Sequence, residues 1–215
     1  MSMAKVYNEQ DKLMVLARYR ERILNYGVSA DSLKSGSIEK QNARHEAHAS
    51  IIKIENPRIL DIGCGIGQFS SFLTTHGIKH QYVGYDIVEE YIAYCKANFP
   101  QGEFQLRNVF EEGIEGQFDY IFLSQVLNNR FRDSDNNMVM KEMIRICLKH
   151  IRIGLSIDMM SKYVDYQSEE LFYYSPEEMF SFAKSLKKRV LLRHDFRPFE
   201  FCLQIFNDDA PGFVK

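Results

Sequence analysis

The feature that most constrains the fold is the segment 58–67, which reads Arg-Ile-Leu-Asp-Ile-Gly-Cys-Gly-Ile-Gly. A short apolar run leads into a turn with glycines at 63, 65 and 67, and a segment with helical periodicity follows. Glycine lets the backbone adopt positive φ and approach a ligand closely, and the free N–H groups at the start of a helix form a polar binding site. The segment therefore predicts a buried strand, a ligand-binding turn and a helix, in that order.

The rest of the chain continues this alternation. Apolar runs predict strands at 58–62, 81–86, 103–107, 118–124, 151–159, 190–195 and 199–206. Apolar spacings of three and four predict helices at 66–76, 88–98 and 134–150. Ser175, Pro176 and Glu178 are an N-terminal signal for one more helix. Residues 196–198 are too short a link for a parallel crossover, so we expect a mostly parallel sheet, covered by helices on both faces, whose last strand is antiparallel.

Two further helical segments, 9–26 and 37–53, precede the first strand and are joined through a polar turn region at 27–36. We interpret them as a lid over the carboxyl edge of the sheet. A chain of 215 residues suits one domain of roughly 100–200 residues with a small appendage. The prediction is a single domain over 1–215, with a helical lid at 1–55 and the α/β core at 56–215.

Composition restricts the partners and the compartment. The formal net charge is −2, and the basic residues form no cluster, which argues against a nucleic-acid partner. No apolar run approaches the roughly 20 residues of a membrane span, and the first residues do not have the pattern of a signal peptide. The four cysteines form no CxxC pair, so we expect reduced, buried thiols in a cytoplasmic protein without a membrane partner.

Two acidic residues indicate the ligand of the glycine turn. A dinucleotide fingerprint reads GxGxxG, but its third glycine is replaced here by Gln68. Asp61 precedes the first glycine by two positions, and a carboxylate there suits an ammonium group, such as that of S-adenosylmethionine, better than a diphosphate. Asp86 ends the second strand, where a carboxylate can accept both ribose hydroxyls of either ligand.

These segments resemble motifs of the class I S-adenosylmethionine-dependent methyltransferases, over about residues 58–206. Leu-Asp-Ile-Gly-Cys-Gly-Ile-Gly is similar to the first motif of that family, and the segments from 84, 104 and 118 are similar to the next three. The ends of the chain resemble a poorly characterised bacterial subgroup. The resemblance implies a Rossmann-like fold with a seven-stranded sheet. It also implies cofactor binding by the residues of these motifs, namely Asp61, Gly63, Cys64, Gly65, Gly67, Asp86, Ile87, Asn108, Val109 and Ser124.

Some of these positions, and others outside the motifs, allow more than one interpretation. Asn108 stands where the family has an aspartate, and its amide oxygen can still accept a hydrogen bond from the adenine amino group. Gln41 and Arg44 share one helix face and either hold the cofactor carboxylate or belong to a solvated surface. Asp158 ends the fifth strand and either faces the site or caps a loop. The spacing of His45 and His48 does not fit a zinc helix, and we expect no metal.

The sequence thus predicts a methyltransferase that uses S-adenosyl-L-methionine, with S-adenosyl-L-homocysteine as product, and methylates a small molecule. Residues 124–127 read Ser-Gln-Val-Leu and lack the Asn/Asp-Pro-Pro-aromatic motif that resembles amide- and adenine-nitrogen enzymes. No general base is evident, and in-line displacement on an activated methyl does not always require one. The alternatives are a non-catalytic cofactor-binding regulatory module and a nicotinamide-dependent oxidoreductase.

Overall fold

The computed structural model describes residues 6–33 and 36–210. Its strands are β1 (Arg58–Ile62), β2 (Gln81–Asp86), β3 (Glu103–Leu106), β4 (Phe118–Leu123), β5 (Ile151–Met160), β6 (Arg189–Arg197) and β7 (Glu200–Phe206). Its helices are α1 (Glu9–Tyr26), the short 3₁₀ helix η2 (Ala30–Leu33), α2 (Ile38–Ala49), α3 (Gln68–Thr75), α4 (Glu89–Asn98), α5 (Val109–Glu112), α6 (Asn136–Leu148) and α7 (Pro176–Leu186).

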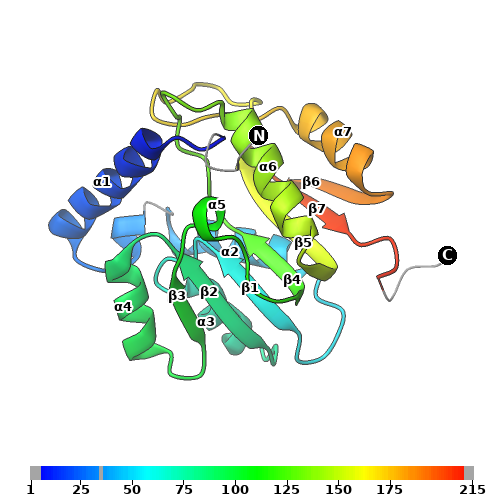
Figure 1. Cartoon of the computed structure of the whole chain (residues 1–215), viewed down its shortest axis with the longest axis horizontal. Helices are drawn as coiled ribbons and strands as arrows, with labels where there is room; N and C mark the ends of the chain where they lie inside the picture. Colours follow the sequence, from blue (N-terminus) through cyan, green and yellow to red (C-terminus); the bar gives the residue numbers. More distant parts are fainter. Residues whose placement is uncertain (1–5, 34–35, 211–215) are drawn as a thin grey trace.

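All seven strands form one sheet in the order β3-β2-β1-β4-β5-β7-β6 (Figure 1). Strands β1 to β5 pair in parallel, and β7 runs antiparallel to both β5 and β6. The predicted fold class is therefore confirmed. The strand order reverses between β1 and β4, and in open α/β sheets ligands bind outside the carboxyl ends of strands at such a point.

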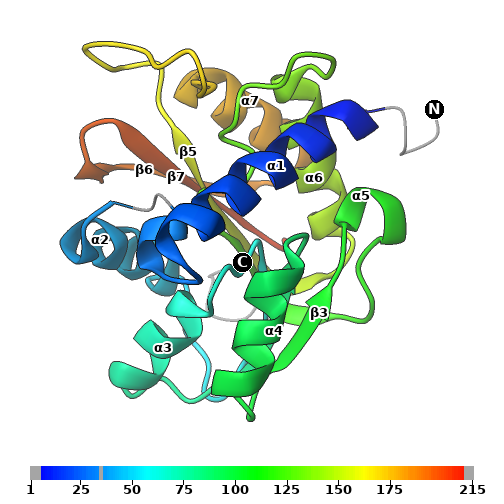
Figure 2. The same cartoon turned by 90° about the vertical axis from the view of Figure 1, so that its left-hand side faces the viewer.

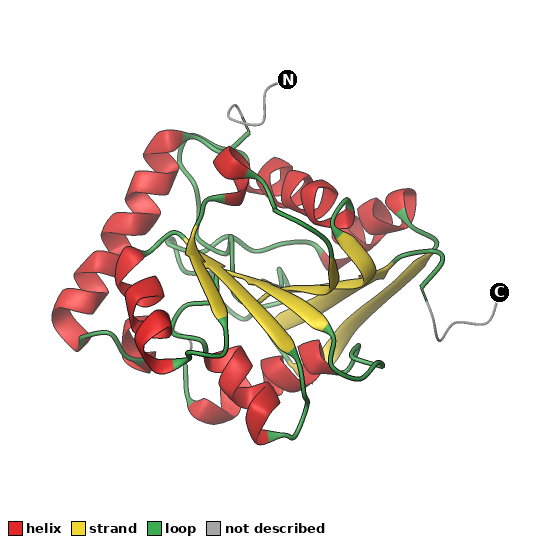
Figure 3. Ribbon diagram, turned by 60° about the horizontal axis from the view of Figure 1, so that its bottom comes forward, coloured by secondary structure: helices red, strands yellow, loops and turns green. Residues whose placement is uncertain are grey.

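Helices cover both faces of the sheet (Figure 3). Successive side chains of a strand point to opposite faces, so Ile59 and Leu60 of β1 belong to different cores. On one face, Ile59 packs in the cluster that contains Phe69 of α3 and Cys95 of α4. On the other face, Leu60 packs in the cluster that contains residues of α6 and α7, such as Met140. A helix layer on each side leaves only the sheet edges open to a ligand.

Helix α1 has the predicted bounds and crosses the front of the molecule in Figure 2. Hydrogen bonds attach it to the loop between β4 and α6, beyond the carboxyl end of β4. Arg18 Nη1 donates to Asn129 Oδ1 at 3.0 Å, and Asp11 Oδ1 accepts from the Arg132 backbone N–H at 2.7 Å. The first N-terminal helix therefore covers the carboxyl edge, as a lid would.

Helix α2 is arranged differently from the expected lid. It ends at Ala49, short of the predicted 53, and packs on the face of the sheet that also carries α3. Gln204 Nε2 of β7 donates to the Ala47 carbonyl at 2.8 Å, and His48 bonds to β5. Because α2 is anchored in the sheet, only α1 has the position of a lid, and the division of the chain at residue 55 stays a prediction.

The element bounds follow the sequence expectations closely. Strand ends agree with the predicted ranges within two residues, and α5 was not predicted. Residues 1–5 of the chain start, and 34 and 35 of the turn region, lie outside the described residues. All four cysteines are buried and free. Among the described helices, none combines the length and the apolar character needed to cross a membrane.

The N-terminal signal of α7 gives a test of the fold. The Ser175 hydroxyl accepts from the Glu178 N–H at 3.3 Å, as predicted for an N-cap. Ser175→Ala is expected to lower the free energy of unfolding by about 0.5–2 kcal/mol, because that N–H loses its partner. Urea denaturation measures the change. Ser181→Ala, at an exposed position inside the same helix, is the matched control and should not destabilise; equal stability of the two variants would contradict the capping role.

Candidate cofactor-binding site

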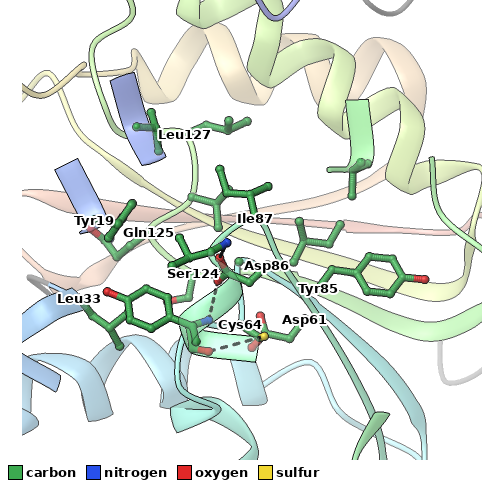
Figure 4. Close-up of a pocket in the computed structure, with 18 of the residues that line it drawn as sticks. Tyr19, Leu33, Asp61, Cys64, Tyr85, Asp86, Ile87, Ser124, Gln125 and Leu127 are labelled. Carbon is green, nitrogen blue, oxygen red and sulfur yellow. Dashed lines mark hydrogen bonds between the residues drawn. The ribbon is translucent and has the colours of Figure 1, made fainter. Parts of the chain in front are cut away.

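A cavity opens at the carboxyl ends of β1, β2, β3 and β4, and α1 and α2 also contribute to its walls (Figure 4). Of the twelve residues that the sequence predicts to bind a cofactor, the cavity brings eleven together. These are Gln41, Arg44, Asp61, Gly63, Cys64, Gly65, Asp86, Ile87, Asn108, Val109 and Ser124. The twelfth, Gly67, is the N-cap of α3, with a left-handed backbone (φ 76°).

The turn after β1 is held by the neighbouring strand. The backbone N–H groups of Gly63 and Cys64 both donate to the Tyr85 carbonyl, at 2.7 and 3.0 Å. Gly63 has φ 76°, and a Cβ there would overlap the side chain of Val126 from the loop after β4. Glycine is therefore required twice over, by the backbone conformation and by the close approach of that loop.

Asp86 connects this turn to the end of β2. Its Oδ2 accepts from the Gly65 N–H at 2.8 Å, and its Oδ1 accepts from the Val88 N–H at 2.9 Å. Burial raises the pKa of Asp86, and the backbone N–H groups of Val88, Gly65 and Ile87 oppose that rise. A carboxylate offers about four acceptor positions, so acceptor capacity remains for a ligand hydroxyl.

Asp61 places an incompletely satisfied carboxyl group at the cavity. Its Oδ2 accepts from the Tyr82 hydroxyl, whereas its Oδ1 is buried with no hydrogen-bond partner in the structure. Burial raises the pKa of Asp61 to about 7, although Tyr82 and His48 act in the opposite direction. A buried acceptor without a donor is costly, and a cationic ligand group would supply the missing partner.

Asn108 ends the strand-to-helix turn after β3. Its Oδ1 accepts from the Phe110 N–H at 3.0 Å and caps α5, so the oxygen expected for the ligand is already in use. Its Nδ2 is buried without a partner. The group with unmet bonding capacity is therefore the amide donor, while the oxygen keeps one lone pair. Ile87 and the buried Val109 line the cavity beside it.

Gln41 and Arg44 lie on the buried face of α2, which excludes the alternative of a solvated surface. Gln41 Oε1 accepts from Gln68 Nε2 at 2.9 Å, so the residue that replaces the third fingerprint glycine connects α3 to α2. Arg44 Nε forms a buried ion pair with Glu200 Oε2 at 2.7 Å. Both side chains reach the cavity from an element fixed to the sheet.

The loop after β4 reaches the cavity with an unusual backbone. Gln125 and Leu127 have φ of 59° and 65°, a region that costs non-glycine residues energy. Tyr174 donates to the Leu127 carbonyl at 2.7 Å, and Ser124 Oγ donates to Asp158. Asp158 is fully buried and holds the loop, so the second interpretation of this residue, a loop contact, is the one observed.

Sequence reasoning missed several lining residues. Tyr19 reaches the cavity from α1, and burial raises the pKa of its phenol to about 12, which leaves a neutral hydroxyl at physiological pH. Burial lowers the pKa of His45 to about 3, so this lining imidazole is uncharged. The spacing of Val15 and Tyr19 by one helical turn was the available signal for α1, but periodicity does not say which cavity a helix faces.

The Cys64 side chain lines the cavity from the core side of the turn. The Cys64 thiol lies near Cys95 in the core below the turn, and this neighbour and burial raise its pKa, which disfavours a thiolate nucleophile. Within residues 6–33 and 36–210, no three histidine, cysteine or acidic side chains come together as a metal site requires.

Comparison with known proteins finds similarity to methyltransferases over part of the chain. Residues 59–150 match the family model described as a methyltransferase domain. Ribosomal RNA small subunit methyltransferase C of Cronobacter sakazakii is 32% identical over 101 residues, which cover 45% of this chain and 29% of that protein. The Salmonella choleraesuis protein of the same name is 32% identical over 103 residues, with the same coverage. The match thus spans less than a third of these relatives.

Solved structures share the fold across nearly the whole chain. The DhpI–SAM–HEP complex superposes with a TM-score of 0.67 at 14% identity, over 92% of this chain and 98% of that one. Magnesium protoporphyrin IX methyltransferase from Synechocystis PCC 6803 with bound SAM gives 0.61 at 13% identity, over 92% and 97%. The plantazolicin methyltransferase BpumL, solved with a triazolic desmethylPZN analog and SAH, gives 0.60 at 13% identity, over 93% and 99%.

The sheet order and the glycine turn at the end of β1 define a Rossmann-like α/β domain with a cavity at its switch point. Residues 59–150 of this domain match a methyltransferase domain, and solved methyltransferase structures share its fold.

The unpaired oxygen of Asp61 leads to a titration test. We expect the Asp61 carboxyl to titrate near pH 7 in NMR spectra of the unliganded protein. Since its folded pKa lies above its ordinary value of 3.8, its contribution to stability is fully present below about pH 4 and is lost as the pH rises through 7.

A matched pair of tyrosines controls this experiment. Tyr82→Phe removes the donor to Asp61 and should raise the Asp61 pKa further. Tyr120→Phe removes a buried hydroxyl on β4, which pairs with the other side of β1, and this hydroxyl accepts from the Lys53 N–H. This variant should leave the Asp61 pKa unchanged. Titration of Asp61 near pH 4 in the wild-type protein would contradict the described environment.

Proposed function

We propose that the protein binds S-adenosyl-L-methionine in the cavity at the carboxyl edge and transfers its methyl group to a small-molecule acceptor. The observation that carries the proposal is the pairing of two carboxylates with the glycine turn: Asp86 is tied to the turn by a hydrogen bond, and Asp61 keeps an unpartnered oxygen at the cavity. The two carboxylates match the ribose hydroxyls and the ammonium group of this cofactor.

The remaining lining residues fit the other parts of the cofactor. Arg44 and Gln41 supply polar groups on α2 for the carboxylate of its methionine moiety. The Asn108 Nδ2 donor suits a ring nitrogen of adenine, and Ile87 and Val109 supply apolar contacts to that ring. Ser124 lies on the loop after β4, where the resemblance places the methionine end.

The cofactor supplies an activated methyl group for in-line displacement, so the task of the chain is to orient the cofactor and the acceptor. The loop residues beside the cavity are apolar or amides, namely Val126, Leu127, Asn129 and Phe131. Tyr19 is a neutral hydroxyl there and could donate to the acceptor or accept from it. The acceptor then brings its own nucleophile, and the enclosing side chains keep bulk water from the reacting atoms.

Three observations favour a small acceptor. Helix α1 covers the cavity and is bonded to the loop after β4 by Arg18 and Asp11. The net charge is −2, which does not suit a nucleic-acid backbone. The segment Ser124–Leu127 lacks the Pro-Pro-aromatic motif. Relatives named for ribosomal RNA make RNA the alternative acceptor, and incubation of labelled cofactor with RNA and with metabolite extracts would separate the two.

Calorimetric titration tests the cofactor assignment. Wild-type protein is expected to bind S-adenosylmethionine and S-adenosylhomocysteine saturably, and not NADH. Asp86→Ala should weaken both affinities about tenfold or more, because hydrogen bonds to a charged group are lost, at about 1.5–3 kcal/mol each.

Glu89→Ala is the matched control, since it removes an exposed carboxylate just three positions away, and it should leave the affinity unchanged. A folded wild-type protein that does not bind, or that binds NADH alone, would overturn the proposal. Binding without transfer to any extract component would favour the non-catalytic regulatory module.

A further inference from the structure

A fully buried carboxylate lies behind the cavity wall, at the end of β5. Asp158 is completely shielded from solvent and accepts four hydrogen bonds. Its Oδ1 receives the Gln125 backbone N–H at 2.7 Å and Gln125 Nε2 at 2.8 Å. Its Oδ2 receives Ser124 Oγ at 2.9 Å and His48 Nε2 at 3.0 Å. The carboxylate therefore uses its full acceptor capacity, and three of its four donors come from the loop after β4.

His48 provides the opposite charge. It is completely buried on α2, and its Nδ1 lies 2.8 Å from Ser156 Oγ, two residues before Asp158 on β5. Burial alone would lower the pKa of His48, but Cys202 and the hydrogen bond to Asp158 raise it to about 10. The imidazolium compensates a carboxylate that would otherwise be buried without a counter-charge.

A second buried ion pair meets the same loop. Glu200 pairs with Arg44 at 2.7 Å and with Arg197 at 3.0 Å. Gln125 Nε2 lies 3.4 Å from Glu200 Oε2 as well as 2.8 Å from Asp158. The Gln125 side chain is thus held between two buried carboxylates from two neighbouring strands.

This network holds the strained backbone of the loop at Gln125. Gln125 and Leu127 both have left-handed φ, which persists only when the surroundings determine it. The loop in turn presents Val126 against Gly63, so its position also fixes the space above the glycine turn. Ser124, Gln125, Val126 and Leu127 line the cavity, whereas Asp158 and His48 stand behind it.

We propose that Asp158 and His48 are positioning residues, which hold the loop 124–127 against the methionine end of the cofactor without touching the cofactor themselves. The inference rests on the proposed function. Position 158 needs a side chain that only accepts hydrogen bonds. The NH₂ group of an asparagine would instead face donors of Gln125, Ser124 or His48. Carboxylate and imidazolium must therefore act together to preorganise the loop.

The test measures cofactor affinity and stability in the same variants. Asp158→Asn is expected to weaken S-adenosylhomocysteine binding about tenfold or more in calorimetry, since at least one charge-assisted bond to the loop is lost. Ile157→Ala is the matched control, because Ile157 directly precedes Asp158 on β5 and points into the core on the opposite face of the sheet. Its truncation should lower the melting temperature but leave the affinity within about twofold.

A double variant separates positioning from mere stability. Combining His48→Gln with Asp158→Asn removes both buried charges and should recover part of the melting temperature lost in Asp158→Asn. Affinity should stay low, because the acceptors for the Gln125 and Ser124 donors are still incomplete. If affinity returns together with stability, or never falls in Asp158→Asn, the positioning role is wrong.

Amide hydrogen exchange tests the loop independently of cofactor binding. The Gln125 N–H should be strongly protected in the wild-type protein without cofactor, because Asp158 holds it in a preformed loop. Fast exchange of this N–H would overturn the inference even if Asp158→Asn fails to fold. Absence of binding by the wild-type protein would instead refute the proposed function, and protection of Gln125 would still decide whether the loop is preorganised.

Discussion

The hydrogen bond from the Gly65 N–H to the Asp86 carboxylate is the interaction on which the site depends. It joins the turn after β1 to the end of β2, and the Tyr85 carbonyl reinforces the junction by accepting from Gly63 and Cys64. Parallel pairing of β1 and β2 brings these groups to one edge. These contacts hold the glycine turn together without a ligand.

Buried charge is concentrated on one side of this arrangement. Asp61, His48 and Asp158 lie on the face of the sheet that carries α2, and Arg44 meets Glu200 nearby. Buried ion pairs are weak devices for stability, because desolvation offsets much of their attraction. Here they hold the loop after β4, which has two left-handed residues, against Gly63. The free energy needed to bury these charges is therefore associated with a defined cavity wall.

Much of the fold followed from the sequence because its signals are local. The glycine turn, the N-cap Ser175 and the short link between the last strands fixed the element order and the antiparallel end. The placement of α2 could not be derived in this way. Its contacts with Ser156 and Asp158 join residues more than 100 positions apart, and no spacing rule records such a pair.

The site was predictable to the same extent. Motif residues at strand ends meet because parallel strands share an edge, so Asp61, Asp86 and Asn108 could be named. Which atom of Asn108 is available depends on the cap that its oxygen makes to Phe110, a detail of tertiary geometry. Tyr19 was missed for a related reason, since its helix approaches the site from outside the motifs.

The most direct test of the cofactor site is a titration of ¹⁵N-labelled protein with S-adenosylhomocysteine, followed by backbone amide chemical shifts. We expect the largest changes at Gly65, Ile87, Val109 and Ser124, one for each strand end that lines the cavity. Changes confined to the loop 130–137, or no saturable change at all, would contradict this cofactor site.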